Sequence, residues 1–168
     1  MQFSCRPTEL EGVKLIQPLT VFEDDRGDYI ETYNRDAYRD AGIVTDFKQD
    51  DYATSRKHVL RGLHGDDKTE KLVSCPFGKL FFVALQADED HPQYMQWTSV
   101  ELSNTNRTQV YVPAKMAIGY LVLSDVGIFQ YKQSTYYHET KQFTIKWNDD
   151  RANIAWPIEQ TIRSQRDA

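Results

Sequence analysis

Asp50-Asp51-Tyr52-Ala53-Thr54-Ser55-Arg56-Lys57-His58-Val59-Leu60-Arg61-Gly62-Leu63-His64, followed by the turn Gly65-Asp66-Asp67, is the stretch that decides the fold prediction. In an extended chain, residues 60, 62 and 64 face one side and residues 59, 61 and 63 face the other. An apolar, glycine-containing strand that ends in a histidine before a turn is typical of a barrel strand that reaches the mouth, where ligand sites are often built. His64 is therefore a candidate site residue, although a lone histidine is more often a packed or solvated side chain.

The rest of the chain repeats this pattern of short strands and turns. Turn signals recur about every ten residues, and the runs between them are rich in β-branched and aromatic residues, as in 80–85, 108–112, 119–123, 128–131 and 143–147. This spacing predicts an all-β sandwich or barrel. One short helix is expected over Asp36–Ala41, with Asn34 as its N-cap and Gly42 just after its end.

Composition bounds the class of protein. The 168 residues predict one domain, 1–168, and the net charge of −5 argues against a nucleic-acid-binding protein. No apolar run has transmembrane length and the N-terminus is not signal-like, so we expect a cytoplasmic protein without a membrane partner. Two cysteines make no disulfide framework, and Cys75, between apolar neighbours, is expected in the core.

Several blocks of sequence occur together in a characteristic order. They are Asp25-Arg26-Gly27-Asp28-Tyr29-Ile30-Glu31, Phe47-Lys48-Gln49-Asp50, Val59-Leu60-Arg61-Gly62-Leu63-His64, Lys71-Leu72-Val73, Asn106-Arg107, Tyr111-Val112-Pro113, Leu123-Ser124, Phe129-Gln130-Tyr131-Lys132, Tyr136-Tyr137, Trp147-Asn148-Asp149 and Trp156-Pro157. From about residue 20 onward, the chain thereby resembles the dTDP-4-dehydrorhamnose 3,5-epimerase family. The resemblance implies a jelly-roll (cupin) barrel with one or two short helices, a nucleotide-diphosphate 4-keto sugar as ligand, a homodimer, and no metal or other cofactor.

The four histidines bear on the metal question independently. His58, His64, His91 and His138 show no His-x-His spacing that would put two ligands on one strand face, which disfavours a metal site. A distant pairing of His64 with a carboxylate stays open.

Epimerisation beside a ketone needs a base, a group that stabilises the enolate, and an acid on the opposite face. The resemblance implies His64 as the base, and an imidazole suits this role because its pKa lies near neutral pH. It also implies Asp167, in Ser164-Gln165-Arg166-Asp167, as the carboxylate that orients His64. Against this, Asp167 is the penultimate residue of the sequence, and chain ends usually fray.

Tyr131 is the implied acid and Lys71 the implied oxyanion stabiliser. By periodicity alone, Tyr131 is one of ten tyrosines and a core position is its default. Lys71 precedes the apolar pair Leu72-Val73 and could face into the barrel, but spacing alone does not choose it over Lys68. The implied ligand contacts are Arg26, Glu31, Gln49, Asp51 and Arg61. The two arginines suit a diphosphate, and the region from Arg26 to Glu31 is expected to reach a neighbouring subunit's site.

Three positions depart from the family pattern. Ile118 stands where the family has an active-site histidine, Gly65-Asp66 replaces an aromatic residue and a glutamine, and Asp51 replaces an asparagine. All three touch implied substrate contacts, which indicates conserved proton-transfer chemistry on an altered substrate. The His-Gly-Asp variant resembles epimerases of GDP-linked 4-keto heptoses.

The leading prediction is therefore an isomerase that inverts C3, C5 or both of a nucleotide-linked 4-keto-6-deoxy sugar or 4-keto heptose, for a surface polysaccharide or deoxysugar. One alternative is a 3,4-ketoisomerase of the same barrel, although its paired-histidine arrangement is not matched. The other is a nucleotide-sugar-binding barrel that lost turnover when Ile118 arrived.

Overall fold

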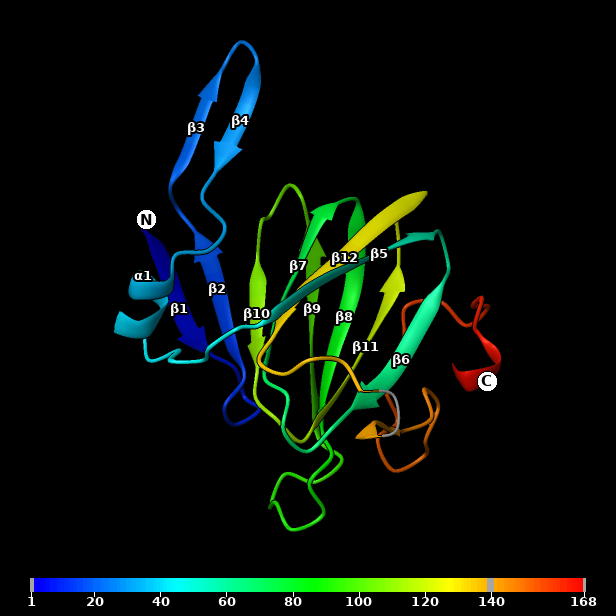
Figure 1. Ribbon diagram of the computed structural model, residues 1–168. Helices are drawn as coiled ribbons and strands as arrows, with labels where there is room; N and C mark the ends of the chain where they lie inside the picture. Colours follow the sequence, from blue (N-terminus) through cyan, green and yellow to red (C-terminus); the bar gives the residue numbers. More distant parts are fainter. Residues whose placement is uncertain (1, 139–140, 168) are drawn as a thin grey trace.

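The computed structural model describes residues 2–138 and 141–167, whose strands form two antiparallel sheets that enclose a barrel, and a separate two-stranded hairpin (Figure 1). The first sheet has the order β1 (Phe3–Pro7), β2 (Lys14–Pro18), β10 (Gln109–Val112), β7 (Lys71–Phe77), β12 (Val126–Gln133) and β5 (Gln49–Arg56). The second has the order β13 (Phe143–Thr144), β6 (Leu60–Gly65), β11 (Met116–Val122), β8 (Lys79–Gln86) and β9 (Trp97–Ser103). The predicted all-β jelly-roll barrel is confirmed.

Two apolar clusters explain why the second sheet carries unbroken apolar runs. Inside the barrel, Val73 and Phe129 of the first sheet pack with Leu80 and Phe82 of β8. The alternate side chains of β8, such as Val83, pack on the outer face against the chain that follows β13. A strand with both faces buried has no need of alternating polar positions, which explains the continuous apolar run 80–85.

A short helix covers the outer face of the first sheet. Helix α1 (Arg35–Asp40) buries Tyr38, and the Asn34 side chain accepts a hydrogen bond from the N–H of Ala37 at 3.2 Å. Gly42 follows the helix with φ of +75°, a left-handed conformation that glycine adopts without steric cost. The predicted helix and its caps are confirmed, with both ends one residue earlier than expected.

The expected strand at 143–147 is shorter than predicted. Only Phe143–Thr144 forms β13, although Ile145 still exchanges backbone hydrogen bonds with Leu63. The chain then turns at 148–152 and covers the outer face of β6 and β8, which ends the ladder. Further on, Ile162 forms a parallel bridge with Val59, and η2 (Gln165–Asp167) closes the described chain.

A hairpin of β3 (Val21–Asp24) and β4 (Gly27–Ile30) projects beyond the two sheets (Figure 1). Phe22 and Tyr29 stand on it with 65% and 69% of their surface exposed, and their ring centroids lie 6.4 Å apart. Arg107 binds the carboxylates of Asp28 and Glu23 and ties the hairpin to the barrel. None of the helices in the described ranges is long and apolar enough to cross a membrane.

Candidate active site

The position of His64 depends on the close approach of β6 to β11. His64 lies opposite Ile118 in this ladder. Gly62 has φ of +115°, and a Cβ there would lie 2.6 Å from both the Cα of Gly119 and the carbonyl oxygen of Ile118. Only glycine fits this approach. The glycine in the apolar stretch before His64 therefore allows β6 to approach β11, and this approach places the histidine against its cross-strand neighbour.

His64 forms a dyad with Asp167. Its Nε2 lies 2.6 Å from Oδ1 of Asp167, and the Ser164 hydroxyl donates to the other carboxylate oxygen at 2.8 Å. Asp167 is only 6% exposed, so the end of the described chain is folded onto the barrel. With Nε2–H donating to the carboxylate, Nδ1 is left as the basic nitrogen. The structure thus brings together the two residues that the family resemblance paired.

Burial controls the protonation of His64. Removal from water lowers the pKa of the imidazole below its ordinary value of 6.5, and the nearby charges of Arg166 and Lys71 lower it further. The hydrogen bond and charge of Asp167 oppose this shift without reversing it. His64 is therefore neutral at pH 7, which is the form that can accept a proton.

A cavity of about 330 Å³ lies in front of His64. Its walls come from both sheets and from the segment that ends in η2, and the residues that matter for the chemistry are His64, Arg61, Ile118, Lys71, Tyr131 and Asp167. Strict alternation would have put Arg61 and His64 on opposite faces of β6, and that expectation is wrong. The register of β6 on β11 shifts between Ile118 and Tyr120, and both side chains reach the same cavity.

Tyr131 lies on β12, in the sheet that faces His64. Desolvation raises the pKa of its phenol to about 12, and the charge of Asp51, its cross-strand neighbour on β5, adds to the rise. Its ring packs 5.5 Å from that of Phe129. Tyr131 is therefore protonated at neutral pH and lines the cavity from the wall opposite β6.

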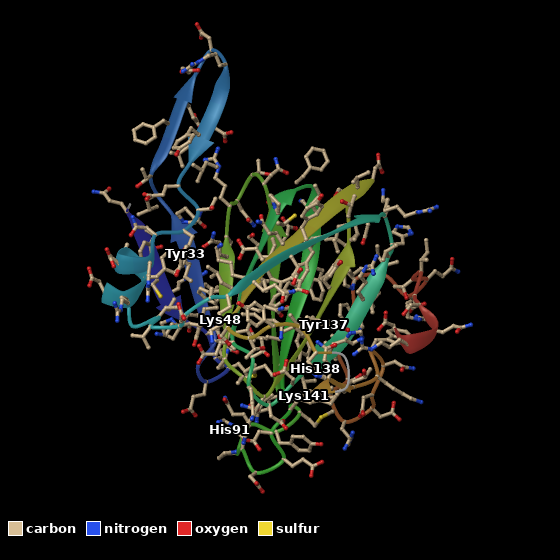
Figure 2. All side chains as sticks on the ribbon, in the orientation of Figure 1. Tyr33, Lys48, His91, Tyr137, His138 and Lys141 are labelled. Atoms are coloured by element: carbon tan, nitrogen blue, oxygen red, sulfur yellow. The ribbon has the colours of Figure 1, made fainter. Side chains whose placement is uncertain are left out.

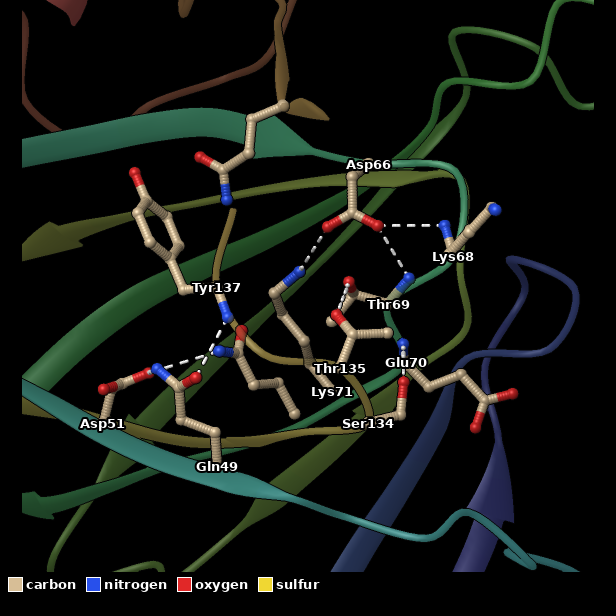
Figure 3. A network of polar contacts seen from close by, with 12 residues as sticks. Gln49, Asp51, Asp66, Lys68, Thr69, Glu70, Lys71, Ser134, Thr135 and Tyr137 are labelled. Carbon is tan, nitrogen blue, oxygen red and sulfur yellow. Dashed lines mark hydrogen bonds and ion pairs between the residues drawn. The ribbon is translucent and has the colours of Figure 1, made fainter. Parts of the chain in front are cut away.

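Lys71 starts β7 and is buried, whereas Lys68 is exposed. Burial therefore distinguishes Lys71 from Lys68 as the candidate, which spacing in the sequence alone could not do. Figure 3 shows the Lys71 ammonium directed towards Asp66, whose Oδ2 lies 3.9 Å from Nζ. Lys71 also lines the cavity and brings a positive charge close to His64.

Gln49 and Asp51 lie at the edge of this region rather than among the residues that line the cavity. The Gln49 amide donates to Asp51 at 2.8 Å, and its oxygen accepts from the backbone N–H of Tyr137 (Figure 3). These bonds link β5 to the chain after β12. Because Tyr137 lines the cavity, Gln49 and Asp51 position one of its walls.

Arg26 and Glu31 are not brought into the site of their own chain. Arg26 lies at the tip of the projecting hairpin, pairs with Asp24 and has a side chain that is 88% exposed. Glu31, at the hairpin's other end, accepts a hydrogen bond from Asn34. Neither lines the cavity formed by the described part of the chain.

The cavity residues that had not been predicted include Tyr120, Gln142 and Arg166. Arg166 donates to Gln142 at 3.0 Å, which closes the cavity on the side of η2. Tyr120 is buried in the cavity wall. The sequence could have indicated Arg166, because it lies in the Ser164–Asp167 segment that carries Asp167. It could also have indicated Tyr120, which lies two residues after the divergent Ile118.

The other histidines take no part in the dyad. Figure 2 shows His91 on the loop between β8 and β9, at the lower end of the view and away from β6. Its Nδ1 accepts from the backbone N–H of Gln93, and its other ring nitrogen lies 3.5 Å from Glu11. His91 therefore has a local structural role.

Comparison with known proteins gives a consistent result over nearly the whole chain. A model of the family described as dTDP-4-dehydrorhamnose 3,5-epimerase matches residues 7–168. The enzyme of that name from Escherichia coli K12 is 42% identical over 154 residues, which cover 89% of this chain and 83% of the relative.

Solved structures share the fold at similar coverage. A dTDP-6-deoxy-D-glucose-3,5-epimerase from Legionella pneumophila, in complex with dTDP-4-keto-L-rhamnose, superposes with a TM-score of 0.94 at 35% identity, over 99% of this chain and 90% of that one. A 3′-monoepimerase from Streptomyces bikiniensis, in complex with dTDP-quinovose, gives 0.89 at 26% identity, over 96% and 83%.

Proposed function

The chain belongs to the dTDP-4-dehydrorhamnose 3,5-epimerase family, and from this premise we propose that it inverts C3, C5 or both of a nucleotide-linked 4-keto-6-deoxy sugar. Both carbons flank the C4 ketone, so a proton on either is acidic enough to be removed as the enolate forms. The reaction needs no redox step, because the proton that leaves one face is replaced by a proton on the other.

One observation carries this proposal: His64 and Tyr131 line one cavity from opposite sheets. A base and an acid on opposite walls are what inversion of a carbon between them requires. His64 takes the proton at Nδ1 and becomes an imidazolium, which Asp167 stabilises through Nε2. Tyr131 then gives its phenolic proton to the opposite face. For the next turnover the tyrosinate takes a proton from solvent and the His64 imidazolium releases its proton to solvent.

Cationic side chains stabilise the enolate and bind the diphosphate in this proposal. The Lys71 ammonium stabilises the negative charge that develops on the C4 oxygen. Arg61, whose Nε donates to Ser55 at 3.2 Å, keeps its terminal nitrogens for the diphosphate. Ile118 contributes an apolar surface beside His64, so no side chain at this position polarises the ketone.

Proton NMR in D2O tests the function directly. The protein is incubated separately with a dTDP-linked and a GDP-linked 4-keto-6-deoxy sugar while the C3 and C5 signals are followed. We expect one or both signals to disappear with at least one nucleotide, and the number of lost signals counts the carbons that exchange. Failure of both signals to exchange with either sugar, and with a GDP-linked 4-keto heptose, would contradict the proposal.

From the same family membership we expect a homodimer, in which the hairpin of each chain completes the partner's site. Arg26 is exposed on a projecting hairpin that also carries Phe22 and Tyr29, an apolar pair with no cover in its own chain. Such a projection is typical of an element that packs on a second copy. Arg26 would then reach the diphosphate in the partner's cavity.

Mixed dimers test this arrangement. Arg26→Ala homodimers should lose about 10- to 100-fold in kcat/KM, as expected when a charged hydrogen bond is removed. A dimer of one Arg26→Ala chain and one His64→Ala chain, isolated with two different affinity tags, should recover about half of the wild-type activity. Its Arg26→Ala protomer keeps His64 and receives Arg26 from its partner.

If Arg26 acts within its own chain, the mixed dimer has two defective sites, and its activity should not exceed the residual activity of the Arg26→Ala homodimer. Arg35→Ala, which also removes an exposed arginine outside the cavity, is the matched control and should leave kcat/KM unchanged. Light scattering on the wild type and on a Phe22→Ser/Tyr29→Ser double variant measures the oligomeric state itself.

A further inference from the structure

Lys71 is a buried cation in the cavity wall, and one described carboxylate lies close enough to act as its partner. Asp66 Oδ2 is 3.9 Å from Lys71 Nζ, and the two side chains keep only 13% and 9% of their surface exposed. A buried ammonium tends to lose its proton unless an opposite charge lies near it. The state of Lys71 therefore depends on a residue of the turn between β6 and β7.

The turn holds the Asp66 carboxylate in place. Its Oδ1 accepts the backbone N–H groups of Lys68 at 2.9 Å and Thr69 at 2.7 Å, as Figure 3 shows. These two bonds occupy one oxygen and leave the other directed at the Lys71 ammonium. They also favour the ionised carboxylate, and together with the charge of Lys71 they lower the pKa of Asp66 against the opposing effect of burial.

We propose that Asp66 is a positioning residue for the reaction: it holds the Lys71 ammonium charged and in place at the wall of the cavity that contains His64. Asp66 acts through Lys71, and this role rests on the proposed function, in which Lys71 stabilises the enolate. Asp66 also follows directly on the strand that carries the base, so one turn connects the base to the counter-ion of the enolate-stabilising cation.

The charges around Lys71 are consistent with this role. Burial lowers the pKa of Lys71, and Asp66 is the group that opposes the decrease. Lys71 in turn lowers the pKa of His64, so its positive charge helps to keep the base neutral. The titratable groups that share the cavity from the other elements are Arg61, His64, Tyr120, Tyr131, Tyr137, Arg166 and Asp167.

The first test measures the charge of Lys71 without any substrate. Protein labelled with ¹³C-lysine is titrated by NMR, and a Lys71→Gln variant assigns the Lys71 signal. Asp66→Asn keeps an oxygen for the two backbone N–H groups but removes the charge. We expect the Lys71 titration midpoint to fall by about one pH unit or more in Asp66→Asn, as for the loss of a nearby opposite charge.

Asp67→Asn is the matched control, because it removes the same charge one residue further along the turn, where the side chain is exposed. It should leave the Lys71 midpoint where it is in the wild type. The reciprocal measurement uses Lys71→Gln, in which the Asp66 carboxyl should titrate at higher pH. An unchanged Lys71 midpoint in Asp66→Asn, or an unchanged Asp66 midpoint in Lys71→Gln, would overturn the proposal.

The second test is the pH profile of kcat/KM. In Asp66→Asn the alkaline limb should move to lower pH by the same amount as the Lys71 midpoint, and it should not move when Asp66→Asn is added to Lys71→Gln. A uniform decrease at every pH would instead show that Asp66 only stabilises the turn. If the wild type has no turnover, the proposed function fails, and the NMR titration still decides whether Asp66 holds the charge of Lys71.

Discussion

His64→Ala is expected to abolish deuterium exchange at both carbons beside the ketone. The imidazole is the group that accepts the proton, and general-base catalysis contributes about 10²- to 10⁴-fold to such a step. The variant should lose the full contribution of general-base catalysis, because the Asp167 carboxylate remains but has no imidazole to orient. Proton NMR in D2O under the conditions used for the wild type measures this loss at C3 and C5 separately.

The pH dependence supplies an independent check on the same residue. Because burial lowers the pKa of His64, its neutral form persists to lower pH than in an exposed histidine, and the acid limb of kcat/KM is expected below 6.5. His91→Gln, at a histidine on the β8–β9 loop, should leave both the rate and this limb unchanged. Exchange at the wild-type rate in His64→Ala would show that another group is the base.

Tyr131→Phe is expected to separate loss of the proton from its return. The variant keeps His64, so deuterium still enters at the face from which the proton was taken. Without a phenol on the opposite wall, inversion should fall by about 10²- to 10⁴-fold, while exchange stays within about tenfold of the wild type. The ratio of exchange to inversion, from the NMR signals of the starting sugar and its epimers, reports the difference.

The phenol suits this role because its pKa of about 12 keeps it protonated across the working range. Tyr52→Phe, at an exposed tyrosine on β5, removes the same hydroxyl outside the cavity and should change neither rate. Equal losses of exchange and inversion in Tyr131→Phe would argue that Tyr131 shapes the cavity without donating a proton.

Local patterns in the sequence predicted the fold well because they depend on neighbours along the chain. Turn residues bounded the strands, and Asn34 and Gly42 bounded the helix by hydrogen bonding and left-handed geometry. The family resemblance is confirmed by the match over residues 7–168. The strand at 143–147 was overestimated, because packing against the outer face, and not β-propensity, decides where that ladder ends.

The site depends on contacts that spacing alone does not encode. His64 and Asp167 are 103 residues apart, and only the resemblance suggested their pairing. A register shift placed Arg61 beside His64, against the simple alternation of a strand. The counter-ion of Lys71 was not foreseen, because the direction of the Asp66 side chain is set by backbone N–H groups in the turn. The roles of all these residues remain predictions.

The segment that carries Asp167 can open separately from the two sheets, so the stability of the activity differs from the stability of the fold. It is held to β6 mainly by the Val59–Ile162 bridge, the backbone hydrogen bonds beside it and the His64 contact, while the two sheets keep their own ladders and core. Such a segment can open with a free energy well below that of global unfolding. Mild heat or denaturant should therefore abolish the activity while circular dichroism still reports intact sheets. A bound nucleotide sugar should bring the loss of activity and the unfolding of the sheets to the same temperature or denaturant concentration.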